Sequence, residues 1–201
     1  MPATPEAPPH RIPIEALGAD ALPPARISVE LYHRMIQSGV LASGDPLELL
    51  DGILVRKMTK NPPHTLVCTR IRDRFLPVHG SDWLVRQEAP VTLSRSEPEP
   101  DVSVVRGPDT TFMDRNPAGP DCVLVVEVAD SSIRRDIVKA DLYAEAGVPE
   151  YWIIDIDNRE LIVHRGPTPD GYRDVSTAAE ASVRVGGQDV RVDLDEVLAG
   201  L

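Results

Sequence analysis

Apolar and polar positions along the chain predict a succession of strands and helices. The apolar run at 122–129 (CVLVVEVA) is typical of a strand buried on both faces. Residues 133–146 predict a helix, and the run at 151–156 (YWIIDI) predicts a second buried strand. A strand, a helix and another buried strand in succession indicate a βαβ-like unit inside a mixed sheet.

Further elements are expected on both sides of this unit. The segment at 47–57 (LELLDGILVRK) predicts a hairpin that turns at Asp51-Gly52, a strong two-residue hairpin signal. The other expected elements are a helix at 29–38 capped by Ser28, a helix at 63–79 ended by Gly80, strands at 83–93, 101–105 and 160–164, a cap at Ser131 or Ser132, and short strands near 172–176, 182–185 and 190–193 before a last helical turn.

Composition divides the chain into an arm and one folded part. Seven of the 20 prolines fall within the first 24 residues, so we expect residues 1–26 to form a flexible arm. With 201 residues in all and 42% apolar side chains, residues 27–201 can bury the core of a single domain. The start has no basic stretch followed by an apolar core, which argues against a secretory signal, and no apolar run reaches the roughly 20 residues of a membrane span.

Charge and cysteine content narrow the class of protein. The net charge of −11 argues against a protein that coats nucleic acid by charge alone, but not against an enzyme that meets phosphates through metal ions. Cys68 and Cys122 lack CxxC-type spacing. We therefore expect a reduced, cytoplasmic chain with two inert thiols and no zinc site.

Glu127 is the one charged residue within the predicted buried strand at 122–129, and its carboxylate needs a positive partner. An isolated carboxylate there would cost several kcal/mol, on the order of the penalty for an unpaired buried charge. Position 129, on the same face of the strand, holds alanine. The nearest lysine is Lys139, which shares one helix face with Asp136 and Tyr143. The helix runs back over the strand, so it can return Lys139 to the height of Glu127.

Asp101 supplies a second carboxylate. It follows Pro100 at the start of the strand at 101–105. Asp101 and Glu127 together could hold a divalent cation, because hard oxygen ligands suit Mg²⁺. Such an ion lowers the pKa of a bound water and offsets charge on an attacked phosphate, and a lysine can orient that water.

Four motifs lead to a family resemblance: ELLDG at 48–52, PD at 100–101, VVEV at 125–128 and RRDIVKADLYAEAGVPEYWIID at 134–155. In these, over roughly residues 28–165, the chain resembles the Uma-two family of restriction-endonuclease-like proteins, within the PD-(D/E)XK nuclease superfamily. The resemblance implies an α/β fold, a restriction-endonuclease-like mixed β-sheet flanked by helices. It also implies a divalent-metal phosphodiesterase core, in a homodimer.

The resemblance also assigns roles to individual residues. Asp101 and Glu127 match the metal ligands, and Lys139 matches the family's helix-borne lysine, which explains Ala129 where the superfamily has lysine. Glu48 matches an outer or second-metal acid. His64 matches a histidine that opens the first long helix.

Each of these residues also has a structural interpretation. Glu127 and Lys139 could form a buried ion pair and nothing more, and Asp101 could be a turn residue. Lys139 and Glu48 could face solvent, and His64 could be a cap or surface residue. The remaining alternatives are phosphate contact or exposure for Arg134 and Arg135, and a core position for Tyr143 and Trp152.

Two functions follow from these observations. The first is a metal-dependent endonuclease that uses Mg²⁺ (or Mn²⁺) to hydrolyse phosphodiester bonds in DNA. The second is a catalytically silent nuclease-fold dimer that acts as an interaction or regulatory module. The set Asp101, Glu127 and Lys139 favours the first function, whereas the acidic balance and the lack of an obvious basic DNA-reading element favour the second.

Overall fold

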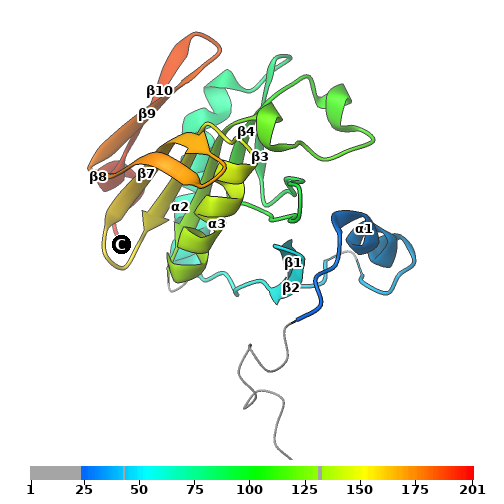
Figure 1. The fold of residues 1–201 in the computed structure, drawn as a ribbon. Coiled ribbons are helices and arrows are strands. Elements are labelled where there is room, and N and C mark those ends of the chain that lie inside the picture. Colours follow the sequence, from blue (N-terminus) through cyan, green and yellow to red (C-terminus); the bar gives the residue numbers. More distant parts are fainter. Residues whose placement is uncertain (1–23, 43, 131–132) are drawn as a thin grey trace, which may run out of the picture.

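A six-stranded mixed sheet forms the centre of the molecule (Figure 1). The computed structural model describes residues 24–42, 44–130 and 133–201. The sheet has the order β3-β4-β5-β6-β7-β8, in which β5 and β6 are parallel and the other neighbours are antiparallel. The helix α3 connects β5 to β6, as the βαβ-like pattern predicted, because parallel strands need a crossover. The elements are α1 (Val29–Gln37), β1 (Leu47–Leu50), β2 (Ile53–Arg56), α2 (Pro62–Phe75), β3 (Trp83–Gln87), β4 (Val102–Arg106), β5 (Cys122–Ala129), α3 (Ile133–Glu145), β6 (Glu150–Asp155), β7 (Glu160–Thr168), β8 (Gly171–Ala178), β9 (Glu180–Val185), β10 (Gln188–Asp193), α4 (Leu194–Val197) and the short 3₁₀ helices η2 (Leu76–Val78), η3 (Asp109–Phe112) and η4 (Gly119–Asp121).

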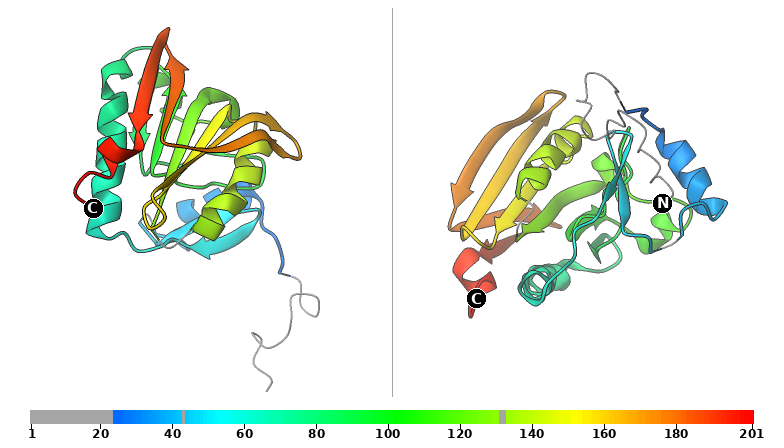
Figure 2. Two further views of the ribbon diagram at one scale, coloured as in Figure 1. Left: turned by 90° about the vertical axis from the view of Figure 1, so that its left-hand side faces the viewer. Right: turned by 90° about the horizontal axis from the view of Figure 1, so that it is seen from below.

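Two helices cover opposite faces of the sheet (Figure 2). On β5, Leu124, Val126 and Val128 pack in the core under α2, together with the β9–β10 hairpin and α4. Val125 and Ala129 belong to the second core, under α3. Since strand side chains alternate between faces, Glu127 falls on the α3 face with these two residues. The alternation of side chains along β5 therefore places Glu127 on the face that is covered by α3, the helix that carries Lys139.

The β1–β2 hairpin forms as predicted and turns at two residues with positive φ, Asp51 (46°) and Gly52 (76°). The hairpin is tied to the segment that leads to Asp101. The Glu97 N–H donates to the Leu49 carbonyl at 2.7 Å, and the Gly52 N–H donates to the Arg95 carbonyl at 2.7 Å. Glu48 directly precedes Leu49 in β1, so these hydrogen bonds fix its position relative to the segment that leads to Asp101.

Several element boundaries differ from those predicted. The α-helix at 63–79 ends at Phe75 and continues as η2, since Pro77 has no N–H for the helical hydrogen bond. The strand at 83–93 ends at Gln87, where Glu88 takes a φ of 50° and Pro90 follows. Strands β7 and β8 are longer than expected. The cap predicted at Ser131 or Ser132 lies outside the described residues.

The proposed arm overlaps the described residues only at its end. Residues 1–23 lie outside them, whereas Arg26, which we expected in the arm, forms an ion pair with Asp51 on the hairpin. The next residue, Ile27, donates its N–H to the Gly52 carbonyl at 2.9 Å. Among the described residues, none of the helices combines the length and apolar character needed to cross a membrane.

Candidate active site

The four residues predicted to carry chemistry lie in one cleft. The cleft has a volume of about 90 Å³ and opens between the β1–β2 hairpin, the loop after β2, the start of α2, the end of β5 and α3. It brings together Glu48, Asp101, Glu127 and Lys139. The other lining residues are Lys57, Met58, Thr59, Lys60, His64, Glu99, Asp130, Arg135 and Asp136.

Lys139 reaches Glu127 from the covering helix. Its Nζ donates to Glu127 Oε1 at 3.1 Å, and the Tyr143 hydroxyl donates to the same oxygen at 3.3 Å. Glu127 and Lys139 are only 4% and 5% exposed, so the solvent-exposed alternative for Lys139 is wrong. Tyr143 and Trp152 are buried in the core, as expected.

Glu48 is the second partner of Lys139. It is 3% exposed, and its Oε2 lies 3.3 Å from Lys139 Nζ. An exposed position for Glu48 is therefore wrong. The ammonium sits between two buried carboxylates, one from β1 and one from β5.

Negative charge exceeds positive charge around Glu127. Burial raises the pKa of Glu127 well above its ordinary value although Lys139 opposes the rise, and nearby carboxylates add to it. Burial works against the charged form of Lys139, but Glu127 and Glu48 outweigh it and raise the pKa of the ammonium. The lysine therefore stays protonated, and the carboxylates around it would be stabilised by further positive charge.

Asp101 lies at the end of the β4–β5 ladder. It is one residue beyond the Val102–Val126 pair, which brings it to the level of Glu127. Its Oδ2 accepts the Val128 N–H at 2.8 Å and lies 3.3 Å from His64 Nε2. Burial would raise the pKa of Asp101, but the hydrogen bond and charge of His64, with the Val128 N–H, hold it below its ordinary value. Asp101 is thus a buried, oriented carboxylate rather than a turn residue on the surface.

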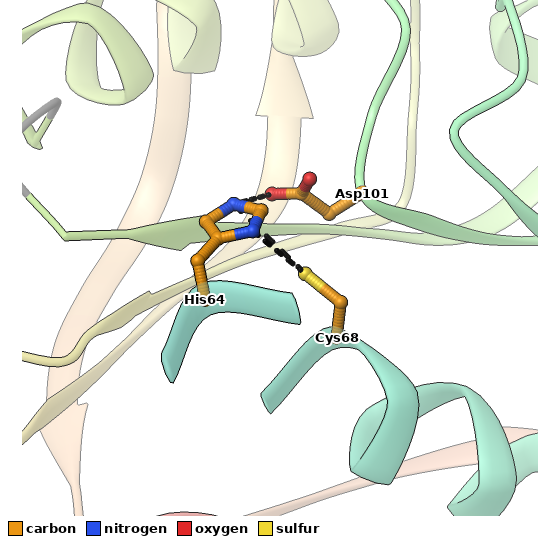
Figure 3. A group of neighbouring side chains, drawn as sticks. All are labelled: His64, Cys68 and Asp101. Carbon is orange, nitrogen blue, oxygen red and sulfur yellow. Dashed lines mark hydrogen bonds and ion pairs between the residues drawn. The ribbon is translucent and has the colours of Figure 1, made fainter. Parts of the chain in front are cut away.

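His64 and Cys68 extend this arrangement into α2 (Figure 3). His64 is buried, and the N-cap of α2 is Asn61, so the interpretation of His64 as a cap is wrong. One ring nitrogen, Nδ1, lies 3.5 Å from Cys68 Sγ, while Nε2 faces Asp101. Burial raises the pKa of the Cys68 thiol, which keeps it protonated. The i, i+4 spacing of the two residues is the one signal for this contact in the sequence.

Comparison with known proteins places the chain in a family. The family model Uma2, described as "Putative restriction endonuclease", matches residues 29–195. The chain belongs to this family. A solved structure described as a "putative nuclease" of the DUF820 group, from Anabaena variabilis, superposes with a TM-score of 0.67 at 14% sequence identity. The match covers 86% of this chain and 98% of that one, which confirms the predicted fold. No curated protein matches the chain.

In this Uma2-family chain, the two predicted metal ligands keep oxygens available in the cleft. Among the described residues, Glu127 Oε2 has no hydrogen bond, and Asp101 Oδ1 has only Lys60 Nζ, at 3.8 Å. The other oxygen of each carboxylate, Glu127 Oε1 and Asp101 Oδ2, accepts the hydrogen bonds from protein groups. Carboxylate oxygens are hard ligands of the kind that Mg²⁺ and Mn²⁺ prefer.

Positive side chains form part of the cleft wall. Lys60 also lies 2.8 Å from Glu88, and Lys57 lies 2.5 Å from Glu99. Arg135 is half-buried and donates to the Arg56 carbonyl at 2.8 Å, whereas Arg134 is exposed. Sequence reasoning missed Lys60, because its place beside Asp101 depends on the path of the loop between β2 and α2.

Proposed function

We propose that the protein is a divalent-metal-dependent endonuclease that hydrolyses phosphodiester bonds in DNA. The observation that carries the proposal is the cleft in which Asp101, Glu127 and Lys139 meet although they come from three separate elements. The restriction-endonuclease description of the family supports the same chemistry. A buried ion pair alone would explain Glu127 and Lys139, but not the oriented Asp101 beside them.

Asp101 and Glu127 would hold Mg²⁺ or Mn²⁺ through the two oxygens that the protein leaves available. Such an ion, when bound, lowers the pKa of a coordinated water and offsets the negative charge of the phosphate. The Val128 N–H and His64 fix the position of Asp101, and Tyr143 fixes that of Glu127. These partners contact Asp101 Oδ2 and Glu127 Oε1, so the other oxygen of each carboxylate would serve the ion.

Lys139 is the residue that we assign to the attacking water and the phosphate. Its ammonium can orient the water and stabilise the extra negative charge on the phosphate as the new bond forms. Glu48 contacts the ammonium at 3.3 Å, so we assign Glu48 as a positioning residue for Lys139. Two carboxylates on either side of the lysine leave it little freedom to turn away from the cleft.

DNA as the substrate, a homodimer and a cytoplasmic location are further parts of the proposal. Lys57, Lys60 and Arg135 on the cleft wall can contact phosphates locally, even though the chain has a net charge of −11. Two active sites in a homodimer would cut both strands of a duplex. Size-exclusion chromatography with light scattering tests the homodimer.

The test of the proposed function is cleavage of supercoiled plasmid in Mg²⁺ or Mn²⁺. Wild type should nick or linearise the plasmid, and Asp101→Asn and Lys139→Ala should lose about 10²–10⁴ in rate, as expected for loss of a positioned catalytic group. Asp155→Asn is the matched control, because Asp155 is equally buried at the end of β6 but does not line the cleft.

The rival function predicts a different result from the same assay. If purified wild type cuts neither DNA nor RNA with either metal, the catalytically silent module replaces the nuclease. If wild type cuts and Lys139→Ala cuts equally fast, the role assigned to Lys139 is wrong.

A further inference from the structure

We propose that His64, Cys68 and Asp101 form a second metal site, selective for a thiophilic cation such as Zn²⁺, whose occupation inhibits the nuclease. The metal site stands on its own, and the inhibition rests on the proposed function. The three side chains point toward one another (Figure 3), and two of them, His64 and Asp101, line the cleft. Among the described residues, they are the only group of three or more His, Cys, Asp or Glu whose ligand atoms all lie within 4.8 Å of one another.

The distances within this group suit a tetrahedral ion. Zinc bonds of about 2.3 Å to sulfur and about 2.0–2.2 Å to nitrogen and oxygen, at tetrahedral angles, put sulfur about 3.6 Å from nitrogen and nitrogen about 3.4 Å from oxygen. Cys68 Sγ lies 3.9 Å from His64 Nε2, and His64 Nε2 lies 3.3 Å from Asp101 Oδ2. Because Sγ also lies 3.5 Å from Nδ1, it sits beside the ring and not in line with the lone pair of Nε2, so a rotation of the Cys68 or His64 side chain must accompany binding. Three protein ligands leave a fourth position for water.

The ligand types decide which cation is preferred. A thiolate and an imidazole favour Zn²⁺ or Co²⁺, whereas Mg²⁺ prefers oxygen. Binding replaces the S–H bond of Cys68 with a sulfur–metal bond and releases the proton to solvent. The i, i+4 spacing on α2 places the thiol next to the ring. His64 lines the cleft, which gives the ion a route to the buried sulfur.

The two metal sites share Asp101, so they compete. An ion bound through Asp101 Oδ2 would draw the carboxylate toward α2, away from Glu127. A second divalent ion a few ångströms away would also be repelled, since its charge has the same sign. A single carboxylate, Asp101, would thus serve one site for a hard cation and one for a soft cation.

The binding test uses Co²⁺ alone as a spectroscopic probe, with no substrate. Wild type should develop cobalt–thiolate absorption in the near ultraviolet at one equivalent. Cys68→Ala and Cys68→Ser should lose this absorption. Their affinity for Co²⁺ should fall by at least about 10–100-fold, the loss typical for removing even a partner of a metal ligand. Cys122→Ala is the matched control, since Cys122 is also a free, fully buried cysteine.

The outcomes of the binding test are distinct. Absorption in wild type and Cys122→Ala, but not in either Cys68 variant, supports the site. No absorption in wild type, or absorption that persists in both Cys68 variants, overturns it. If Cys68→Ala fails to fold, Cys68→Ser still tests the site, because serine is close to cysteine in size.

The inhibition test compares Mg²⁺-dependent nicking with and without Zn²⁺ within each variant. The ratio of the two rates should fall at least about tenfold in wild type and Cys122→Ala, and much less in the Cys68 variants, as expected from loss of a zinc ligand. Equal ratios in all variants would overturn the inhibition. A wild type that gives the cobalt absorption but cuts no nucleic acid would refute the nuclease function and leave the soft-metal site standing.

Discussion

Replacement of Lys139 by methionine separates a metal centre from a purely structural ion pair. Methionine keeps the length of the side chain but removes its charge. It leaves Glu48 and Glu127, at 3% and 4% exposure, without their shared cation. Breaking a buried pair in this way costs about 3–5 kcal/mol of the free energy of unfolding. For a chain of 201 residues this corresponds to a fall in Tm of about 6–20 °C, at about 2–4 °C per kcal/mol.

Mg²⁺ should return part of this loss. A cation held by Asp101 and Glu127 supplies the positive charge that the lysine no longer supplies. At a hundredfold excess over Kd the gain is about 2.7 kcal/mol. The gain should be larger in Lys139→Met than in wild type at the same Mg²⁺ concentration, because the bound ion no longer faces an ammonium nearby.

The assay is urea unfolding with EDTA and with Mg²⁺. Lys57→Met is the control, because Lys57 lies on the same cleft but forms a half-buried pair with Glu99. That variant should lose no more than about 1 kcal/mol. If Lys139→Met also loses less than about 1 kcal/mol, the ammonium does not compensate the buried carboxylates. If it loses the full amount and Mg²⁺ restores nothing, the pair is structural and the metal centre is refuted.

Three further predictions concern single residues. Glu127→Gln should abolish the rise in Tm caused by Mn²⁺ while the circular dichroism spectrum stays native, because one ligand is lost and the fold is kept. Lys139→Arg should not restore plasmid nicking, because a guanidinium is larger and planar and cannot take the position of a compact ammonium. Burial lowers the pKa of His164, so the unfolded chain binds a proton more readily than the folded one below about pH 6.5. The free energy of unfolding should therefore fall as the pH falls through that region, and His164→Leu should flatten this slope in urea titrations.

The parts of the fold that follow from local pattern could be predicted from the sequence. The strand at 122–129 has the predicted boundaries, because its apolar run is interrupted only by Glu127 and is flanked by the polar residues Asp121 and Asp130. Helix α3 ends one residue early, before Gly147. The strand at 83–93 was wrong in length, because Glu88 and Pro90 interrupt an apolar run whose composition still favours a strand.

The candidate site, too, could be predicted only where its contacts follow from a local pattern in the sequence. The isolated charge of Glu127 and the helical position of Lys139 predicted their meeting, which the structure places at 3.1 Å. The contact of His64 with both Cys68 and Asp101 was not predicted, because Asp101 is far from α2 in the sequence and reaches the ring only in the folded chain. Contacts that depend on strand register and loop path leave no periodic signal in the sequence.

Anomalous diffraction from crystals grown with Mn²⁺ tests the central claim most directly. The proposed function predicts a manganese peak in the cleft, bound by the carboxylates of Asp101 and Glu127, with Lys139 beside it and no peak in crystals of Glu127→Gln. The claim is contradicted if crystals in saturating Mn²⁺ give no peak in the cleft, or if the ion binds elsewhere and Lys139 remains the sole cation beside Glu127.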